Sequence, residues 1–349
     1  MQANLVYFPD FTDPVAERML RATNHIALHR LDFAWPRDRL DAAFATAHGY
    51  HALPRVEIRE PWFCDAALLQ RAPALLAACS TGAGFDVIDV EACTAAGVIV
   101  CHQSGTNKEA VAEHVLGMMI VLSKKLVQAD KGLRRGAVGD RYAMTGRDIR
   151  GRTIGIIGLG NIGTRVAELC RGLFGMTVLA CDPYLTAEQV ASRGAEKATM
   201  EELLERADFV TVHTPRNAET LGMLGAKQFA RMKPGAIFIQ TARGGIHDEA
   251  ALAEALGSGH LGGAGLDVWV KEPPPADHPL LRFDNVVASP HNAGITHEAL
   301  HSMAVGAAEQ WIAIFRGEVP PRLENPAAWP RYAARFREAF GFAPAALHR

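Results

Sequence analysis

A glycine-rich turn near the middle of the chain constrains the fold more than any other feature. The segment 153–157 has the apolar, β-branched pattern of a buried strand and leads directly into this turn. Gly158, Gly160 and Gly163 then follow at the spacing GxGxxG, before a helical pattern that runs through Phe174. The first glycine permits a tight turn, the second lets the backbone approach a pyrophosphate, and the third allows close packing of helix on strand. This order predicts a dinucleotide-binding unit with the phosphates at the helix N-terminus.

An acidic residue after the next expected strand supports the same ligand. That strand is expected over residues 177–180, and Asp182 follows it, about 20 residues beyond the turn, where a carboxylate accepts hydrogen bonds from the adenosine ribose. The carboxylate would repel a 2′-phosphate, and Pro183 and Tyr184 supply no cation beside it. Arg193 is distant in the sequence. We therefore expect NAD rather than NADP as the cofactor. The structural alternative for the glycine turn is a tight strand-to-helix turn that binds no ligand.

Short apolar runs alternate with helical patterns along most of the chain. In the first hundred residues, strands are expected over residues 5–8, 74–80 and 98–101, with a helical segment over 86–96. A longer helical pattern over residues 107–127 leads to the second series of strands. Beyond the two strands already named, that series comprises residues 209–213, 236–240, 263–267 and 286–289. The alternation predicts an α/β fold with doubly wound parallel sheets, because a parallel crossover usually contains a helix.

Length and composition describe a globular chain with two cores. A length of 349 residues exceeds the usual size of one domain. Hydrophobic residues make up 49% of the chain, which allows substantial burial. Lys and Arg number 36 against 38 Asp and Glu, a balance that gives no long-range attraction for nucleic acid or anionic membranes. No apolar run reaches the roughly 18 residues of a membrane span. We expect a small-molecule ligand, no nucleic acid and no membrane.

The cysteines and the N-terminus favour a cytoplasmic location. The six cysteines include no CxxC pair and mostly lie in apolar runs, where they are expected to be buried thiols. The first residues lack the basic region and the small-residue cleavage site of a signal peptide.

Three polar residues follow the later strands, where an open parallel sheet binds its ligands. Arg243 lies in the run TARGG, in which paired glycines let backbone and ligand approach closely. Glu272 follows the expected strand over 263–267, and His291 follows the one over 286–289. Each has a structural alternative: a surface ion pair for the arginine, a solvated turn carboxylate for the glutamate, and a structural role for any one of 14 histidines.

Over about residues 81–316 the chain resembles the D-isomer-specific 2-hydroxyacid dehydrogenase family. The resemblance lies in the motifs GLGNIG, TVHTPRNAET, TARGG, GLDVWVKEP and SPHNAGIT. It implies an NAD-dependent oxidoreductase for D-2-hydroxy acids and 2-oxo acids, with Arg243, Glu272 and His291 as catalytic residues. Histidine titrates near neutral pH and suits a general acid or base, a carboxylate beside it orients the ring, and a guanidinium matches the substrate carboxylate.

The resemblance also implies a set of cofactor contacts. Asp267 would contact the nicotinamide carboxamide, although it also suits a strand-end turn. The full expected set is Gly158, Gly160, Asn161, Ile162, Gly163, Asp182, His213, Thr214, Pro215, Thr220, Thr241, Ala242, Asp267 and Gly294.

For the substrate, the run 80–86 resembles the family's carboxylate-binding loop, in which glycines let backbone N–H groups point at the anion. Asn107 either faces the substrate or caps the following helix. The expected substrate contacts are Thr81, Gly82, Ala83, Gly84, Asn107 and Arg243. The candidate substrates include glyoxylate, hydroxypyruvate, bulkier 2-oxo acids and 3-phosphoglycerate. Arg55 and Arg59 are either phosphate contacts or solvated side chains.

The resemblance implies two Rossmann-like or flavodoxin-like domains. Residues 1–104 and 299–349 form a discontinuous substrate domain, and residues 105–298 form an inserted NAD-binding domain, with the active site between them. It also implies a homodimer, helped by residues 107–148. Residues 320–330 are proline-rich and expected to be extended, and helical patterning begins at Arg331.

Two other functions fit parts of the sequence. The run His297-Glu298-Ala299-Leu300-His301 matches the zinc-hydrolase motif HExxH, with Glu318 as a third ligand; the pattern also arises by chance, and we expect no metal. Relatives of the resembled family also act as NAD-sensing corepressors, which the fold does not distinguish from an enzyme.

Overall fold

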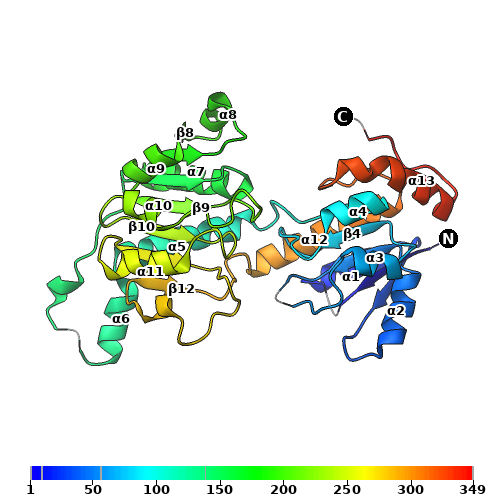
Figure 1. Ribbon diagram of the computed structural model, residues 1–349, viewed down its shortest axis with the longest axis horizontal. Coiled ribbons are helices and arrows are strands. Elements are labelled where there is room, and N and C mark those ends of the chain that lie inside the picture. The colour runs from blue at the N-terminus through cyan, green and yellow to red at the C-terminus, as the bar shows by residue number, and fades with distance from the viewer. Residues whose placement is uncertain (1, 9–10, 56, 138, 348–349) are drawn as a thin grey trace. The chain divides into compact units, whose positions relative to one another are not determined.

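The computed structural model describes residues 2–8, 11–55, 57–137 and 139–347 (Figure 1). The chain divides into two compact units. The terminal unit comprises Met1–Asn107 and Thr296–Arg349, and the central unit comprises Lys108–Ile295. No helix of the described residues has the length and apolar character to cross a membrane.

The central unit is built on a seven-stranded parallel sheet in the order β12-β11-β10-β9-β6-β7-β8. Its strands are β6 (Thr153–Ile157), β7 (Thr177–Cys181), β8 (Glu196–Lys197), β9 (Phe209–Val212), β10 (Ile237–Gln240), β11 (Gly263–Leu266) and β12 (Val286–Ala288). The strand order reverses between β6 and β9, and in open sheets ligands bind at the carboxyl ends of the strands at such a point. The glycine turn follows β6 and therefore lies there.

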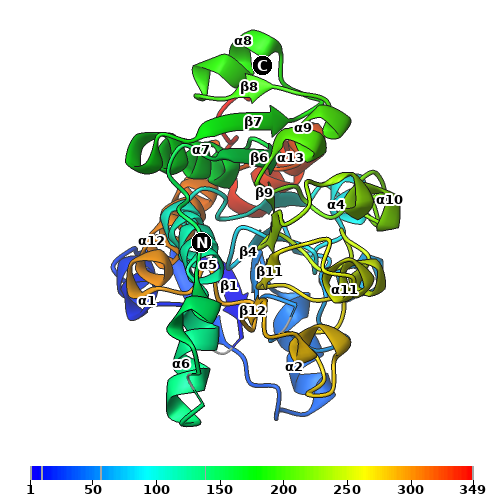
Figure 2. The ribbon, with the colours of Figure 1, turned by 90° about the vertical axis from the view of Figure 1, so that its left-hand side faces the viewer.

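Successive side chains of the central strands enter two separate cores, since neighbouring residues of a strand point to opposite faces. Ile154 and Ile156 pack into one core, and Leu179 and Val210 into the other. Figure 2 shows α5 and α7 on one face of the sheet and α9, α10 and α11 on the other. The helices of this unit are α5 (Lys108–Ser123), α6 (Leu126–Arg134), α7 (Asn161–Phe174), α8 (Ala187–Ser192), α9 (Met200–Arg206), α10 (Ala226–Arg231) and α11 (Glu249–Gly257), with the 3-10 turns η1 (Arg141–Met144) and η2 (Pro279–Arg282).

The helix expected over residues 107–127 is shorter than predicted. It ends at Ser123, and α6 begins at Leu126 after Lys125, whose φ of 53° is left-handed. A left-handed residue interrupts the helical hydrogen-bond series, so the apolar pattern continues across a break that it does not reveal.

The terminal unit has a five-stranded parallel sheet in the flavodoxin-like order β2-β1-β3-β4-β5. Its strands are β1 (Ala3–Tyr7), β2 (Ile26–Arg30), β3 (Gly49–Ala52), β4 (Ala77–Ser80) and β5 (Ile99–Cys101). Its helices are α1 (Pro14–Arg21), α2 (Arg37–Ala45), α3 (Ala66–Arg71), α4 (Val90–Ala96), α12 (His297–Phe315) and α13 (Trp329–Phe340), with the 3-10 turn η3 (Pro326–Ala328). Leu5 and Tyr7 pack with α1, α12 and α13, while Val6 and Phe8 pack into the opposite core. The predicted α/β class with two doubly wound parallel sheets is confirmed.

The prediction did not include β2 and β3. Strand β2 is an edge strand whose last two residues, His29 and Arg30, are exposed, so its pattern is weakly apolar. Strand β3 has the sequence GYHA and is buried because it pairs on both sides, although Gly and Ala have low strand propensity.

The C-terminal segment is less extended than expected. Turn η3 and the start of α13 lie inside the proline-rich run, since proline suits the first turn of a helix. Helix α13 packs on its own chain. Tyr332 and Phe336 are buried, and the Arg335 guanidinium donates to the carbonyls of Pro73 and Ala96.

Candidate active site

Two of the three glycines after β6 occupy positions that only glycine fits, and the middle one leaves open space. Gly158 has a φ of +87°, and a Cβ there would lie 2.8 Å from the Thr214 methyl group. A Cβ on Gly163 would lie 2.2 Å from the Gly158 carbonyl oxygen. A Cβ on Gly160, by contrast, would meet nothing within 4 Å. The open space at the middle glycine is the arrangement that a pyrophosphate needs at the start of α7.

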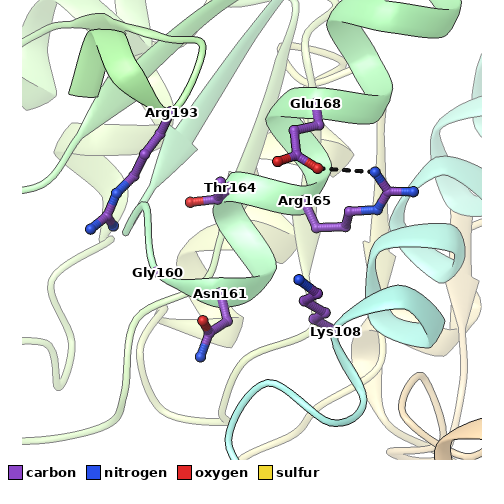
Figure 3. Close-up of a pocket in the computed structure, with 7 residues that line it drawn as sticks. All are labelled: Lys108, Gly160, Asn161, Thr164, Arg165, Glu168 and Arg193. Carbon is purple, nitrogen blue, oxygen red and sulfur yellow. Dashed lines mark hydrogen bonds and ion pairs between the residues drawn. The ribbon is translucent and has the colours of Figure 1, made fainter. Parts of the chain in front are cut away.

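The turn borders a cavity of about 350 Å³ (Figure 3). It is lined by Lys108, Gly160, Asn161, Thr164, Arg165, Glu168 and Arg193. Asp182 fixes the turn, since one of its carboxylate oxygens accepts a hydrogen bond from Leu159 N at 2.9 Å and the other accepts one from Tyr184 N at 3.0 Å.

Polar atoms without partners lie at the carboxyl ends of β9 and β10. Among the described residues, His213 Nδ1, Thr214 Oγ1 and Thr241 Oγ1 are buried and make no hydrogen bond. Burial also lowers the pKa of His213 to about 3, so its ring is neutral at physiological pH. Buried polar atoms are normally satisfied, and three orphans at expected cofactor contacts fit a polar dinucleotide at this edge of the sheet.

Other expected cofactor residues shape the loops. The Thr220 hydroxyl donates to the Pro215 carbonyl at 2.6 Å and accepts from Asn217 N at 2.9 Å. Ala242 N donates to the side chain of Gln240 at 2.8 Å. These bonds fix the backbone after β9 and β10.

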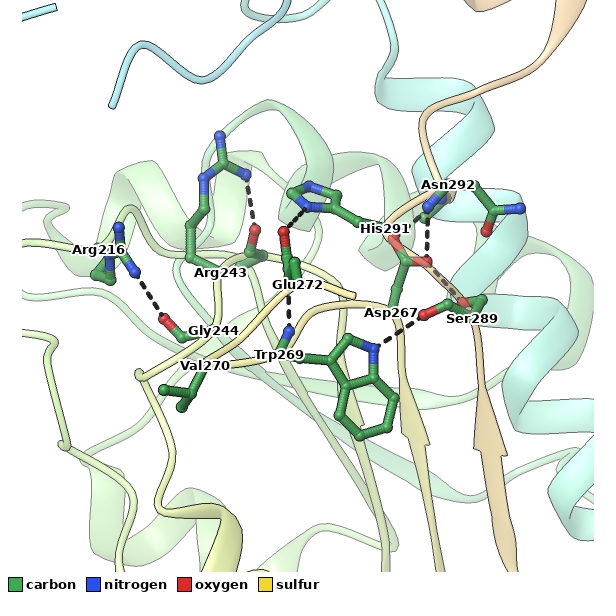
Figure 4. A network of polar contacts seen from close by, with 12 residues as sticks. Arg216, Arg243, Gly244, Asp267, Trp269, Val270, Glu272, Ser289, His291 and Asn292 are labelled. Atoms are coloured by element: carbon green, nitrogen blue, oxygen red, sulfur yellow. Dashed lines mark hydrogen bonds and ion pairs between the residues drawn. The ribbon is translucent and has the colours of Figure 1, made fainter. Parts of the chain in front are cut away.

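The three residues expected to be catalytic come together at the carboxyl ends of β10, β11 and β12 (Figure 4). His291 Nδ1 lies 2.8 Å from Glu272 Oε2, and Glu272 Oε1 accepts a hydrogen bond from Trp269 N at 3.0 Å. Burial alone would raise the pKa of the Glu272 carboxyl, but its hydrogen bonds with His291 and Trp269 and the charge of Arg243 lower it below the ordinary value. Glu272 is therefore an ionised partner that holds one nitrogen of the imidazole and leaves the other for a ligand.

The position of Arg243 depends on the backbone on both sides of it. One guanidinium nitrogen donates to the Ala242 carbonyl at 2.7 Å. A Cβ on Gly244 would lie 1.8 Å from the Trp269 carbonyl oxygen, so only glycine lets the two loops approach. This contact brings the Arg243 segment against the Glu272 segment.

Asp267 braces the loop that carries His291. Its carboxylate accepts hydrogen bonds from the Ser289 hydroxyl at 2.6 Å, Asn292 N at 2.9 Å and Ala293 N at 3.0 Å. His291 N also donates to the Asp267 carbonyl oxygen at 2.7 Å. His291 has a φ of 57°, a left-handed conformation that costs about 1–3 kcal/mol and persists only when its surroundings fix it. Gly294 lies half-buried in the same loop.

The sequence analysis did not identify Ser289, whose hydroxyl lies 3.0 Å from His114 Nε2 and thereby links α5 to Asp267. Only the position of Ser289 directly before Pro290 and His291 gave a signal.

In the terminal unit, the expected carboxylate loop follows β4. Thr81 N donates to the Ala52 carbonyl at 2.9 Å, and the Gly82 carbonyl accepts from Gln103 N at 2.9 Å. Within the described chain, Ala83 N and Gly84 N donate no hydrogen bond, so both are available to an anion.

A buried histidine fixes the first residue of this loop. The Trp311 indole N–H donates to His51 Nδ1 at 3.4 Å, so the proton of the neutral ring is on Nε2, which lies 3.2 Å from the Thr81 hydroxyl. The Thr81 hydroxyl donates to the Ala52 carbonyl at 2.9 Å. Burial lowers the pKa of His51 to about 3, which keeps the ring neutral.

The remaining candidates have simpler surroundings. Asn107 Oδ1 is buried and has no hydrogen-bond partner among the described residues, so it does not cap α5. Arg55 donates to the Asp86 carbonyl at 3.2 Å, and Arg59 lies over the Phe33 ring.

The HExxH run opens α12 after its N-cap, Thr296. His301 Nδ1 lies 3.1 Å from Asp13, and His297 is exposed. Across the described ranges, no group of three or more His, Cys, Asp or Glu side chains is arranged to hold a metal ion.

A doubly wound sheet with a glycine cradle at its reversal point defines a dinucleotide-binding protein. Comparison with known proteins gives its family. Residues 116–293 match the model for "D-isomer specific 2-hydroxyacid dehydrogenase, NAD binding domain". A glyoxylate reductase of Korarchaeum cryptofilum is 40% identical over 264 residues, which cover 75% of this chain and 79% of that protein. The chain belongs to the D-isomer specific 2-hydroxyacid dehydrogenase family, and the resemblance stated from its motifs is confirmed.

Two further relatives define the extent of the likeness. A D-3-phosphoglycerate dehydrogenase of Archaeoglobus fulgidus is 40% identical over 262 residues, 75% of this chain, but the match spans only 49% of that protein. The chain thus spans about half the length of that relative. A crystal structure of D-lactate dehydrogenase from Aquifex aeolicus, complexed with NAD and lactic acid, superposes with a TM-score of 0.78 at 26% identity, covering 92% of this chain and 98% of that one.

Proposed function

We propose that this chain is an NAD-dependent dehydrogenase that interconverts D-2-hydroxy acids and 2-oxo acids. The observation that carries the proposal is the His291–Glu272 pair, held at 2.8 Å on a loop that Asp267 braces. The pair lies in the same unit as the glycine turn, at the carboxyl edge of one sheet.

The chemistry needs a proton donor at the substrate oxygen and a cation for the substrate carboxylate. The dinucleotide, when bound, donates or accepts the hydride. His291 Nε2 would give a proton to the carbonyl oxygen of a 2-oxo acid and would take it back from a 2-hydroxy acid. Glu272 keeps the ring oriented and stabilises its protonated form. Arg243 would hold the substrate carboxylate and polarise the carbonyl.

The cofactor contacts are assigned on the same grounds. The turn residues Gly158, Gly160, Asn161, Ile162 and Gly163 would surround the pyrophosphate, and Asp182 would accept from the ribose. His213, Thr214 and Thr241 would satisfy their buried polar atoms on the dinucleotide. Asp267 has three of its four carboxylate lone pairs in use, which leaves one for the nicotinamide carboxamide.

Within the terminal unit, the loop after β4 would bind a carboxylate. Ala83 N and Gly84 N are its available donors, and Asn107 Oδ1 is a further buried polar atom that a ligand would satisfy. The relatives named glyoxylate reductase and D-3-phosphoglycerate dehydrogenase favour small 2-oxo acids and phosphorylated ones as the first candidates.

The same proposal includes a cytoplasmic homodimer. Helix α6 has no buried residue, and Leu133 of α6 and Tyr142 of η1 are more than half exposed, at 67% and 68%, as expected for a surface that a second copy covers. All six cysteines are free thiols, which suits a reducing compartment. Sedimentation of the purified chain would test the dimer.

The decisive experiment is a screen of NADH consumption with 2-oxo acids of graded size. We expect oxidation of NADH with at least one small 2-oxo acid. Tight NADH binding with no oxidation by any member of the panel would contradict the proposal and would instead indicate an NAD-sensing protein.

A further inference from the structure

The glycine turn has a cation beside it that is far away in the sequence. Arg193 follows α8 directly, and one of its guanidinium nitrogens donates to the Leu159 carbonyl in the turn. Leu159 N donates to Asp182 Oδ2 at 2.9 Å. The same residue of the turn is thus held by an acid on its N–H and by a guanidinium on its C=O, at the end of the site where the adenosine ribose binds.

Arg193 also lines the cavity at the start of α7 (Figure 3). Arg165 lines the same cavity, but Glu109 and Glu168 neutralise it at 2.6 Å and 2.9 Å. Arg193 and Lys108 have no carboxylate partner in the described part of the chain, so the cavity keeps positive charge for an anion.

Asp182 repels a 2′-phosphate less than its position in the sequence suggests. Both of its oxygens already accept backbone hydrogen bonds, from Leu159 N and Tyr184 N, and these dipoles offset part of its charge. The guanidinium of Arg193 supplies a fork that matches phosphate oxygens.

We infer that Arg193 is a cofactor-specificity residue that supplies the cation for a 2′-phosphate, so that the chain accepts NADP(H) as well as NAD(H). This inference rests on the proposed dinucleotide site, which a separate measurement tests. The dinucleotide keeps its contacts with the glycine turn in either form, and only the 2′-phosphate depends on Arg193.

The test measures the dissociation constants of NADH and NADPH with the full chain, by titration calorimetry. Arg193→Leu is expected to weaken NADPH binding roughly tenfold or more, the loss of one charge-assisted hydrogen bond, and to change NADH binding less than about threefold. Arg193→Lys keeps the charge and should restore part of the NADPH affinity. Arg171→Leu is the matched control, because Arg171 is a nearby cation of α7 that does not line the cavity.

Three outcomes would overturn the inference. Equal losses of NADH and NADPH affinity in Arg193→Leu would place the guanidinium on the pyrophosphate. Unchanged affinities for both would remove Arg193 from the site. Wild-type protein that binds NADH but not NADPH would show that Asp182 prevails. Wild-type protein that binds neither dinucleotide would instead contradict the proposed function itself. Circular dichroism of each variant would confirm that it is folded.

Discussion

At the carboxyl end of the central sheet, His291 keeps a carboxylate partner and a side chain that is 33% exposed. Near the carboxyl end of the terminal sheet, His51 is 1% exposed and lies between an indole N–H and a threonine hydroxyl. The two imidazoles are chemically identical, and their surroundings differ. An ionised neighbour and access to solvent suit proton transfer, while an enclosed neutral ring suits a fixed hydrogen-bond relay.

The two sheets also fix the loops at their carboxyl ends with different groups. In the central unit a buried carboxylate, Asp267, accepts from three groups of the loop and fixes His291 in a left-handed conformation. In the terminal unit neutral groups alone fix Thr81. Charged bracing is therefore found where proton transfer is proposed, and neutral bracing where only binding is proposed.

Replacing His291 should produce the largest effect. His291→Ala is expected to lower turnover about a thousandfold, because general acid–base catalysis contributes roughly 10²–10⁴. NADH affinity should remain close to that of the wild type. Steady-state kinetics and NADH titration check both values, and a parallel loss of turnover and NADH affinity would contradict a role in proton transfer.

Removing the charge of Glu272 should have the next largest effect. Glu272→Gln keeps a hydrogen-bonding side chain but not the carboxylate, and turnover is expected to fall about tenfold to a hundredfold. The pKa of Glu272 is lowered in the folded state, so it stabilises the protein above its unfolded pKa, and this stabilisation is lost as the pH falls through the folded value. Denaturation of the variant at several acidic pH values should show a weaker acid destabilisation than the wild type. An unchanged pH dependence would argue against the His291–Glu272 pair.

A smaller effect is expected from the neutral hydrogen-bond relay that joins Trp311, His51 and Thr81. Thr81→Val removes the hydroxyl that His51 contacts while keeping the shape of the side chain, and Thr81→Ser retains the hydroxyl. The first variant should raise the KM for the 2-oxo acid about threefold to tenfold, the value of one hydrogen bond, without changing NADH affinity. Equal kinetics for the two variants would mean that the hydroxyl does not position the loop.

The smallest effect concerns the pH dependence of stability. Burial lowers the pKa values of His51 and His213 to about 3 and that of His247 to about 4, whereas in the unfolded chain each is near 6.5. The unfolded state therefore binds more protons below pH 6.5, and the free energy of unfolding falls by about 1.4 kcal/mol per pH unit for each such group. His51→Gln should make this fall shallower between about pH 6 and pH 4.5. Urea denaturation of both proteins over this range measures the slopes, and identical slopes would refute the neutral state of His51.

Local sequence patterns predicted more of the central unit than of the terminal unit. The strand β6, the glycine turn and α7 were predicted from spacing, because a tight turn demands specific residues at adjacent positions. Strands β2 and β3 were not predicted, since β2 is an edge strand with a weakly apolar pattern and β3 is buried through its pairing with β1 and β4. The break at Lys125 was also missed, because a single left-handed residue leaves the apolar pattern intact.

The candidate site shows the same limit. Arg243, Glu272 and His291 were identified from motifs, but Arg193 and His51 take their places through contacts with residues more than 25 positions away, Leu159 and Thr81. No local pattern marks such residues, because tertiary packing alone decides what a surface arginine or a strand histidine meets.

The most direct test follows the hydrogen itself. NADH deuterated at C4 of the nicotinamide would be incubated with the purified chain and a 2-oxo acid that the chain reduces. The product would be analysed by mass spectrometry and on a chiral column. The account predicts deuterium at C2 of a D-2-hydroxy acid, with His291→Ala producing almost none. An unlabelled product, or a labelled product of L configuration, would contradict it.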